Sequence, residues 1–346
     1  AQYKTDPDLQ AAHAAAPWIC TWDDHESTND SYRTGAENHN PDKGEGEWSE
    51  RKLRALQAYF EWMPLREPEA GKVTSAVWRD FTFGDVATIF ATETRLTGRS
   101  QSIGWSDVLT STDPNEVGAQ AMAHLETIAD PARTMMGAAQ EAWIDKGLKE
   151  SVAEGKTWQV LANQVMMARV ALPNMAEIMT REQIAQTIPQ VQQMVGFSTL
   201  GLPFNLDAWD GYPAARARLY DSVEAAGARL VTLTGDIHSA WADTLVDDAG
   251  KRVGVEFVTT SITSPGIGAY ISDIPDIGQK FTDANPEVEW HDPDGHGYIL
   301  MTLTPERVAG EFVKVSTVLQ TDFTVERVAT YEVTPEARGV SALTRA

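Results

Sequence analysis

A run of polar residues near the amino terminus has the composition of a metal-binding site. It spans residues 22–26, Trp-Asp-Asp-His-Glu, and Asn29 lies three residues beyond it. Two adjacent carboxylates, an imidazole and an amide oxygen suit hard or borderline cations. A purely structural loop could use Asp24 and Asn29 as turn or cap residues, but it has less need of so many such side chains in succession. We therefore interpret this run as a functional site.

A second run, Thr-Gly-Asp-Ile-His at 234–238, follows a predicted strand over 229–233. If the strand continues through it, Asp236 and His238 point the same way because side chains alternate along a strand. Such a pair is a usable half of a metal site. A capping aspartate beside a surface histidine is the open alternative, and the first run makes the metal interpretation more persuasive.

Strands and helices are predicted to alternate along most of the chain, and in this order each polar run directly follows a strand. The first run follows a predicted strand over 18–21, and open α/β sheets carry functional side chains at the carboxyl ends of their strands. Leu53, Leu56, Phe60 and Met63 recur at helical spacing before Pro64. Further helices are expected over 7–16, 119–128, 138–148, 181–188 and 213–226, and strands over 76–83, 86–92, 157–161, 254–260, 298–303, 308–318 and 325–333.

These elements predict an α/β (α+β) fold with a mixed sheet sandwiched by helices. Since no linker rich in Pro, Gly or Ser divides the 346 residues, we expect one domain over 1–346. Residues 164–204 contain five of the ten methionines and are expected to form an insertion within that domain, although ordinary packing of flexible methionines remains an alternative.

Composition excludes several classes of function. The 28 basic and 50 acidic residues give a net charge of −22, so a basic patch for nucleic acid is not expected. No apolar stretch is long and charge-free enough to span a bilayer. No targeting signal is recognised in the sequence, and this says nothing about location. The single cysteine, Cys20, is expected to be a small buried hydrophobe.

Phosphoester hydrolysis needs the residue types found in the two runs. The negative charge of a phosphoester repels nucleophiles, and metal ions neutralise it and polarise water. An imidazole that is not used as a ligand can protonate the departing alkoxide.

The sequence resembles the PhoD-type alkaline phosphatases of the calcineurin-like metallophosphatase superfamily from about Tyr3 to about Val318. The blocks that carry the resemblance are Tyr-Lys-Thr-Asp-Pro-Asp-Leu-Gln at 3–10, Pro-Trp-Ile at 17–19, the run 22–26 with Asn29, Met-Pro-Leu-Arg at 63–66, Arg-Thr-Met-Met-Gly at 133–137, Asn-Gln-Val-Met-Met at 163–167, Asp-Ala-Trp-Asp-Gly-Tyr at 207–212, the run 234–238, and Thr-Ser-Ile-Thr-Ser at 260–264.

The resemblance implies a core of two sheets flanked by helices and a phosphomonoesterase or phosphodiesterase active at alkaline pH. It implies iron and calcium ions, although manganese or zinc would also suit these side chains, and it implies a periplasmic or secreted enzyme. By the same resemblance Asp24, Asn29, Asp236 and His238 bind metal, His25 acts on the leaving group, and Asp23 supports them.

Two departures from the family pattern bear on these expectations. Relatives commonly show Leu-Asp-Thr-Arg where this chain has Thr-Glu-Thr-Arg at 92–95, and no role is assigned to Glu93. Relatives also carry a β-sandwich domain and their first metal-binding segments upstream of the point where this sequence starts. We therefore expect the chain to be the C-terminal portion of such a protein, with a separate, associated N-terminal fragment of the same protein as its partner.

Two other functions remain open at this point. One is a non-catalytic calcium- or phosphate-binding protein that retains half of the metal site. The other is a metallohydrolase that acts on amides or lactones, since a fold does not fix a function.

Overall fold

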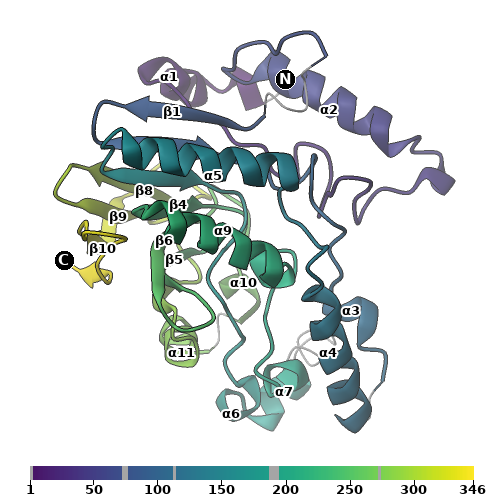
Figure 1. Ribbon diagram of the computed structural model, residues 1–346. Helices are drawn as coiled ribbons and strands as arrows, with labels where there is room; N and C mark the ends of the chain where they lie inside the picture. The colour runs from purple at the N-terminus through teal and green to yellow at the C-terminus, as the bar shows by residue number, and fades with distance from the viewer. Residues whose placement is uncertain (1–2, 72–76, 112–113, 187–194, 272–273) are drawn as a thin grey trace.

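The computed structural model describes residues 3–71, 77–111, 114–186, 195–271 and 274–346, which fold around two β-sheets (Figure 1). The larger sheet has seven strands in the order β1-β2-β3-β4-β6-β5-β7. Its strands are β1 Arg79–Phe83, β2 Ala87–Ala91, β3 Trp158–Ala162, β4 Leu230–Thr234, β5 Ala240–Val246, β6 Arg252–Val258 and β7 Val288–Asp292.

The four central strands of this sheet, β2, β3, β4 and β6, are mutually parallel, and antiparallel strands flank them on both sides. The central strands are buried along most of their length because both faces of the sheet are covered, as is usual for parallel sheets. All four end at the same edge of the sheet, and the loops that leave this edge carry the candidate site.

The smaller sheet is antiparallel, in the order β11-β10-β9-β8, and covers one face of the larger sheet. Its strands are β8 His296–Leu303, β9 Val308–Val315, β10 Val325–Val333 and β11 Thr344–Arg345. Phe312 and Tyr331 of this sheet pack with Trp158 and Phe257 of the larger one. One apolar layer therefore lies between the two sheets.

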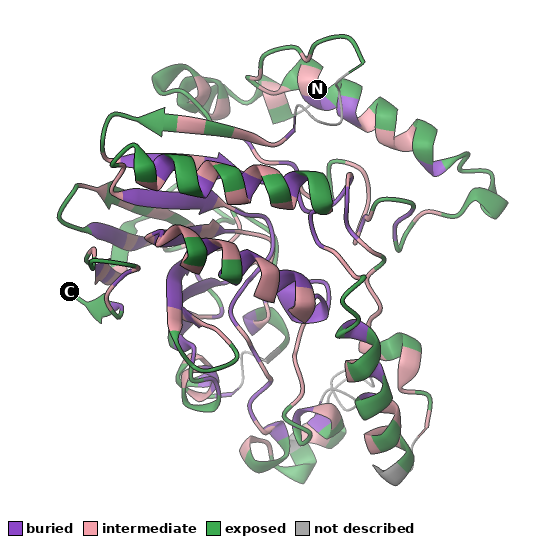
Figure 2. Cartoon of the chain, in the orientation of Figure 1, coloured by how far each residue is buried: buried purple, intermediate pink, exposed green. Residues whose placement is uncertain are grey.

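Helices cover the opposite face of the larger sheet, where α5 and α9 lie across it in Figure 1. Figure 2 shows their buried residues facing the strands and their exposed residues facing away. The described helices are α1 Pro7–Ala15, α2 Trp48–Trp62, α3 Trp105–Val108, α4 Pro114–Ile128, α5 Ala138–Ala153, α6 Met175–Ile178, α7 Arg181–Gln186, α9 Pro213–Ala226, α10 Gly268–Ile271 and α11 Ile277–Ala284, with 3-10 turns at Tyr3–Thr5, Pro41–Lys43 and Trp209–Gly211. Within the described residues, no helix is both long and apolar enough to cross a membrane.

The predicted mixed α/β fold with two sheets and flanking helices is confirmed, and most predicted elements are present. The helix expected over 48–63 ends at Trp62, two residues before Pro64. Helix α9 ends at Ala226 and is capped by Gly227, whose φ of 66° is the left-handed conformation that glycine favours. The end of the helix expected over 181–188 lies outside the described residues, as does the start of the strand expected over 76–83. The division of the chain into one domain with an insertion at 164–204 stays a prediction.

The strand predicted over 18–21 is wrong, since the chain has no regular structure there. The carbonyl of Cys20 instead accepts a hydrogen bond from the side chain of Arg79, at 2.8 Å. An apolar run does not form a strand unless neighbouring backbone groups complete the pairing. Cys20 itself is buried, as expected, in a small apolar cluster with Trp22, Leu56 and Tyr59.

Candidate metal centre

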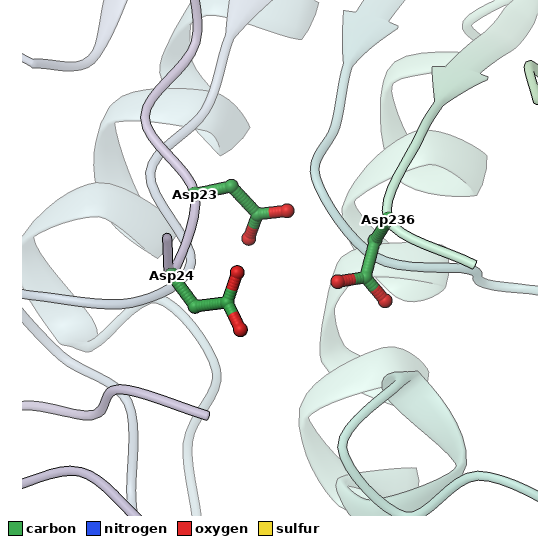
Figure 3. Close-up of side chains that lie close together, drawn as sticks. All are labelled: Asp23, Asp24 and Asp236. Carbon is green, nitrogen blue, oxygen red and sulfur yellow. The ribbon is translucent and has the colours of Figure 1, made fainter. Parts of the chain in front are cut away.

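Three carboxylates converge beyond the carboxyl edge of the larger sheet. Asp23 and Asp24 come from the amino-terminal loop, and Asp236 follows β4 (Figure 3). One oxygen of each carboxylate lies within 4.8 Å of an oxygen of the other two, a separation that a single cation can bridge. The structure thus brings together residues from both polar runs, up to 213 positions apart in the sequence.

The position of Asp23 and Asp24 depends on the residue before them. Trp22 is fully buried and packs its ring edge-on against Tyr59 of α2, at 5.1 Å between ring centroids. The Glu26 carboxylate accepts a hydrogen bond from the Asp23 N–H at 2.8 Å, and Asp24 accepts one from the N–H of Asp30 at 3.0 Å. Helix α2 and these local hydrogen bonds therefore fix the loop.

Asp236 and His238 do not continue strand β4, so the expectation that they point the same way by strand alternation is wrong. Strand β4 ends at Thr234, and both residues adopt left-handed backbone angles, with φ of 69° and 59°. Asp30, at 48°, is also left-handed, so this region holds three of the four described non-glycine residues with positive φ. Such conformations cost about 1–3 kcal/mol each and are concentrated at functional sites.

His238 lies outside the carboxylate group, and a backbone carbonyl holds its ring. Its Nδ1 is 3.1 Å from the carbonyl oxygen of Pro265, which can only accept, so Nδ1 donates this hydrogen bond. A hydrogen bond from the distal nitrogen to a carbonyl is typical of metal-binding histidines. Gly266 permits this approach, because a Cβ there would lie 2.4 Å from the His238 carbonyl oxygen.

The other two predicted site residues lie on the amino-terminal loop. The side chain of His25 is 73% exposed, and its Nε2 is 3.8 Å from the Oδ2 of Asp24, so the imidazole stands at the rim of the site. The amide nitrogen of Asn29 donates to Glu37 at 2.6 Å. A ligand role for Asn29 stays a prediction.

A buried guanidinium, missed by the sequence reasoning, lies among the carboxylates. The Arg95 side chain is wholly buried, and its three nitrogens donate to Asp23 at 2.7 Å, Asp207 at 2.6 Å and Asp236 at 3.2 Å. Asp24 lies at 4.0 Å. Arg95 follows strand β2 just as Asp236 follows β4, so its place at the carboxyl edge of a parallel sheet was the signal that could have found it.

Asp207, also missed, joins Arg95 to a second buried arginine. One of its carboxylate oxygens pairs with Arg95 and the other with Arg99. Burial alone would raise the pKa of Asp207, but Arg99 and Arg95 outweigh it and hold the pKa below its usual range. Asp207 begins the block at 207–212 that the sequence resemblance includes, and that block offered no further sign of a role in the site.

The segment that carries Arg95 is held rigidly by buried side chains. Glu93 accepts hydrogen bonds from the backbone N–H groups of Arg95, Leu96 and Thr97 and from the Thr97 hydroxyl. Gln140 of α5 binds both the N–H and the carbonyl of Glu93, at 2.8 and 2.6 Å. Every one of these contacts restricts the path of the backbone that aims Arg95 at the carboxylates.

The carboxyl groups of the site outnumber its guanidiniums. With Asp23, Asp24, Asp207 and Asp236 all ionised, the guanidiniums of Arg95 and Arg99 would leave two negative charges without a cationic partner. Burial first, and the neighbouring Asp23 second, raise the pKa of Asp236 well above its usual range. The oxygen-rich donor set and its excess negative charge both fit a divalent cation.

Comparisons with known proteins agree with this geometry. The profile of the family described as PhoD-like phosphatase matches residues 1–312. Alkaline phosphatase D of Bacillus subtilis (strain 168) is 32% identical over 321 residues, which are 90% of this chain and 46% of that protein. A solved structure titled "Structure of PhoD" superimposes with a TM-score of 0.73 at 27% identity, covering 100% of this chain and 57% of the other.

This chain therefore spans about half the length of the relatives it matches. Because the family profile covers most of its residues, and the fold and the order of the sequence blocks agree, the chain belongs to the PhoD-like phosphatase family.

Proposed function

We propose that this chain forms the catalytic centre of a metal-dependent phosphoester hydrolase that acts on phosphomonoesters, phosphodiesters or both at alkaline pH. The observation that carries the proposal is the convergence of Asp23, Asp24 and Asp236 around the buried guanidinium of Arg95 at the carboxyl edge of the sheet. Family membership supports the same reaction class.

Asp24, Asn29, Asp236 and His238 would hold the metal ions in this proposal. The carboxylate and amide oxygens suit calcium, and the Nε2 of His238 suits iron, with manganese or zinc as possible substitutes. Bound metal ions would neutralise the phosphate charge and lower the pKa of a bound water.

The remaining residues position groups or move a proton. Asp23 supports the site because its Oδ1 accepts a hydrogen bond from the Nε of Arg95, which keeps the guanidinium between the loop and strand β4. His25 stands at the exposed rim, where an imidazole can exchange its proton with solvent and protonate the departing alkoxide. Arg95 is wholly buried, so its role is to hold the carboxylates together rather than to contact the ester.

Metal content and turnover, measured on the same preparations, test the proposal. Elemental analysis and hydrolysis of 4-nitrophenyl phosphate and bis(4-nitrophenyl) phosphate between pH 6 and 10 are compared for the wild type, His238→Ala and His25→Ala. We expect His238→Ala to lose bound metal and activity together, whereas His25→Ala keeps its metal and loses turnover. The matched control is His13→Ala, at the end of α1.

Three outcomes would contradict parts of this proposal. Full activity in His238→Ala would refute the ligand assignment, and full activity in His25→Ala would refute the proton-transfer role. Stoichiometric calcium without turnover of either ester would favour a non-catalytic calcium-binding protein. Intact mass under denaturing conditions tests the expected N-terminal partner fragment, and cell fractionation tests the proposed periplasmic or secreted location.

A further inference from the structure

A cavity of about 490 Å³ opens beside the metal centre and is separate from the three converging carboxylates. We call it the Trp105 cavity. The lining residues that matter here are Asp30, Tyr32, Glu37, Trp105, Asp107 and Asp207. A volume of this size accommodates a small organic group.

The cavity shares two residues with the site, which fixes its place relative to the ester. Asp207 lines the cavity and pairs with Arg95 and Arg99. Asp30 lines it as well, and its N–H donates to the Oδ2 of Asp24. The cavity and the candidate metal centre therefore adjoin at Asp30 and Asp207.

Aromatic rings form part of the lining, and one of them is held in place on several sides. The lining includes Tyr32, Trp105 and Phe204. The indole nitrogen of Trp105 donates to the carbonyl of Pro203 at 2.8 Å. Its ring packs against His124 and Phe197, with centroids 5.2 and 5.1 Å away. The indole is thus a fixed surface rather than a mobile side chain.

The charged groups of the lining all carry the same sign. Asp30, Glu37, Asp107 and Asp207 are carboxylates, and no lysine, arginine or histidine is among the described residues that line the cavity. Only Asp207 pairs with arginines, which lie behind it, while Asp107 accepts a hydrogen bond from the Gly104 N–H. A second anionic group would therefore be repelled, and a cation would be attracted to both the carboxylates and the ring faces.

We propose that the Trp105 cavity binds the alcohol part of the ester and selects a positively charged alcohol, an amino alcohol or its quaternary ammonium form. The inference rests on the proposed phosphoester hydrolase function and names its substrate class. The phosphate of such a zwitterionic ester would lie at the metal centre, and its ammonium group would lie among the carboxylates and against the Trp105 indole.

Paired substrates that differ only in this charge give the sharpest test. Phosphocholine and its isostere 3,3-dimethylbutyl phosphate have nearly the same shape and differ in the charge of the alcohol part, so their ratio of kcat/KM responds to that charge. We expect the metal-loaded wild type to prefer phosphocholine about tenfold, the discrimination expected for a desolvated cation–π contact. Choline itself should inhibit hydrolysis of 4-nitrophenyl phosphate competitively.

Two variants test the contribution of the Trp105 ring and that of the Asp107 charge separately. Trp105→Leu removes the ring, and Asp107→Asn removes a negative charge while its side-chain oxygen can still accept from Gly104. Both should lower the preference for phosphocholine over 3,3-dimethylbutyl phosphate at least threefold. The matched control is Trp62→Leu, an exposed tryptophan at the end of α2, which should leave the preference unchanged.

The possible failures are distinguishable. Turnover of 4-nitrophenyl phosphate with equal kcat/KM for phosphocholine and its isostere would overturn this inference and leave the hydrolase proposal standing. A preference for glycerol or glucose phosphate would mean that the cavity binds neutral polyols, and would also overturn it. No hydrolysis of any ester by the metal-loaded protein would overturn both proposals.

Discussion

Glu93 offers the most direct test of whether the polar scaffold beneath the site governs its chemistry. Its side chain is fully buried, and its two oxygens accept four hydrogen bonds from the three residues that follow Thr94. The change Glu93→Gln keeps the size of the side chain but replaces one oxygen by an NH₂ group. That group cannot accept, so it must face a backbone N–H in either orientation.

The cost follows from these contacts. If the NH₂ group replaces Oε2, the hydrogen bond from the Thr97 N–H at 3.0 Å is lost, while the Thr97 hydroxyl can rotate and accept instead. A buried donor left without a partner costs about 1–3 kcal/mol, and the remaining bonds weaken because the acceptor is no longer charged. We therefore expect Glu93→Gln to lower the free energy of unfolding by about 2–4 kcal/mol.

Glu93→Gln should also alter the candidate metal centre, because the N–H of Arg95 is one of the four donors to the Glu93 carboxylate. A shift of the guanidinium would loosen its hydrogen bonds to Asp23 and Asp236, so we expect kcat/KM to fall by about 10- to 100-fold, the effect of a small misplacement of catalytic groups. Glu93→Asp keeps the charge, and a shorter carboxylate can still accept from the N–H two residues on, so it should retain most of the activity.

Urea denaturation, kcat/KM for 4-nitrophenyl phosphate and metal content would be measured for both variants and for the control Glu126→Gln, an exposed position on α4. Wild-type stability in Glu93→Gln would refute the hydrogen-bond argument. Reduced stability with wild-type kcat/KM would show that Glu93 supports the fold without positioning Arg95.

Two further changes probe buried charges. Arg95→Lys should lower kcat/KM at least tenfold and reduce metal content, because an ammonium group cannot reproduce the planar fork that binds three carboxylates; equal activity would refute the positioning role. Asp243→Asn should raise the melting temperature more at pH 8 than at pH 5. Burial, with Glu256 and Glu287 nearby, raises the pKa of Asp243 well above 3.8, so this group's contribution to stability is lost as pH rises through the folded-state pKa. Melting curves at pH 5 and pH 8 measure the difference in melting temperature between Asp243→Asn and the wild type, with the exposed Asp221→Asn as control. A difference that does not change with pH would contradict the argument.

The elements found from the sequence are those with a local signal. Helix α2 has apolar residues at helical spacing and a proline at its end, and α9 has a glycine at its end. The sequence analysis predicted no strand over β5 or β7. The β5 sequence carries Asp243 in its middle, and that side chain is fully buried with neither oxygen paired within the described part of the chain. A buried carboxylate breaks the apolar pattern on which strand prediction depends.

The candidate site likewise contains residues that could be found from the sequence and residues that could not. The carboxylates and histidines stood out because their residue types are those of metal ligands, and three of them do converge. Arg95 and Asp207 did not stand out, because each owes its role to partners more than 70 positions away in the sequence. The left-handed backbone at Asp236 and His238 could not be predicted from the sequence either, because neither residue type requires that conformation.

The buried arginines would also help so acidic a protein to bind the anionic substrate proposed above. With a net charge of −22 the surface as a whole repels a phosphate, so attraction has to be local. Arg95 and Arg99 compensate part of the negative charge at the site without reaching solvent, and the proposed metal ions would compensate the remaining carboxylates. Removing Arg95 would increase the negative charge and also let the carboxylates move apart. The guanidinium therefore sets both the charge and the spacing of the candidate metal ligands.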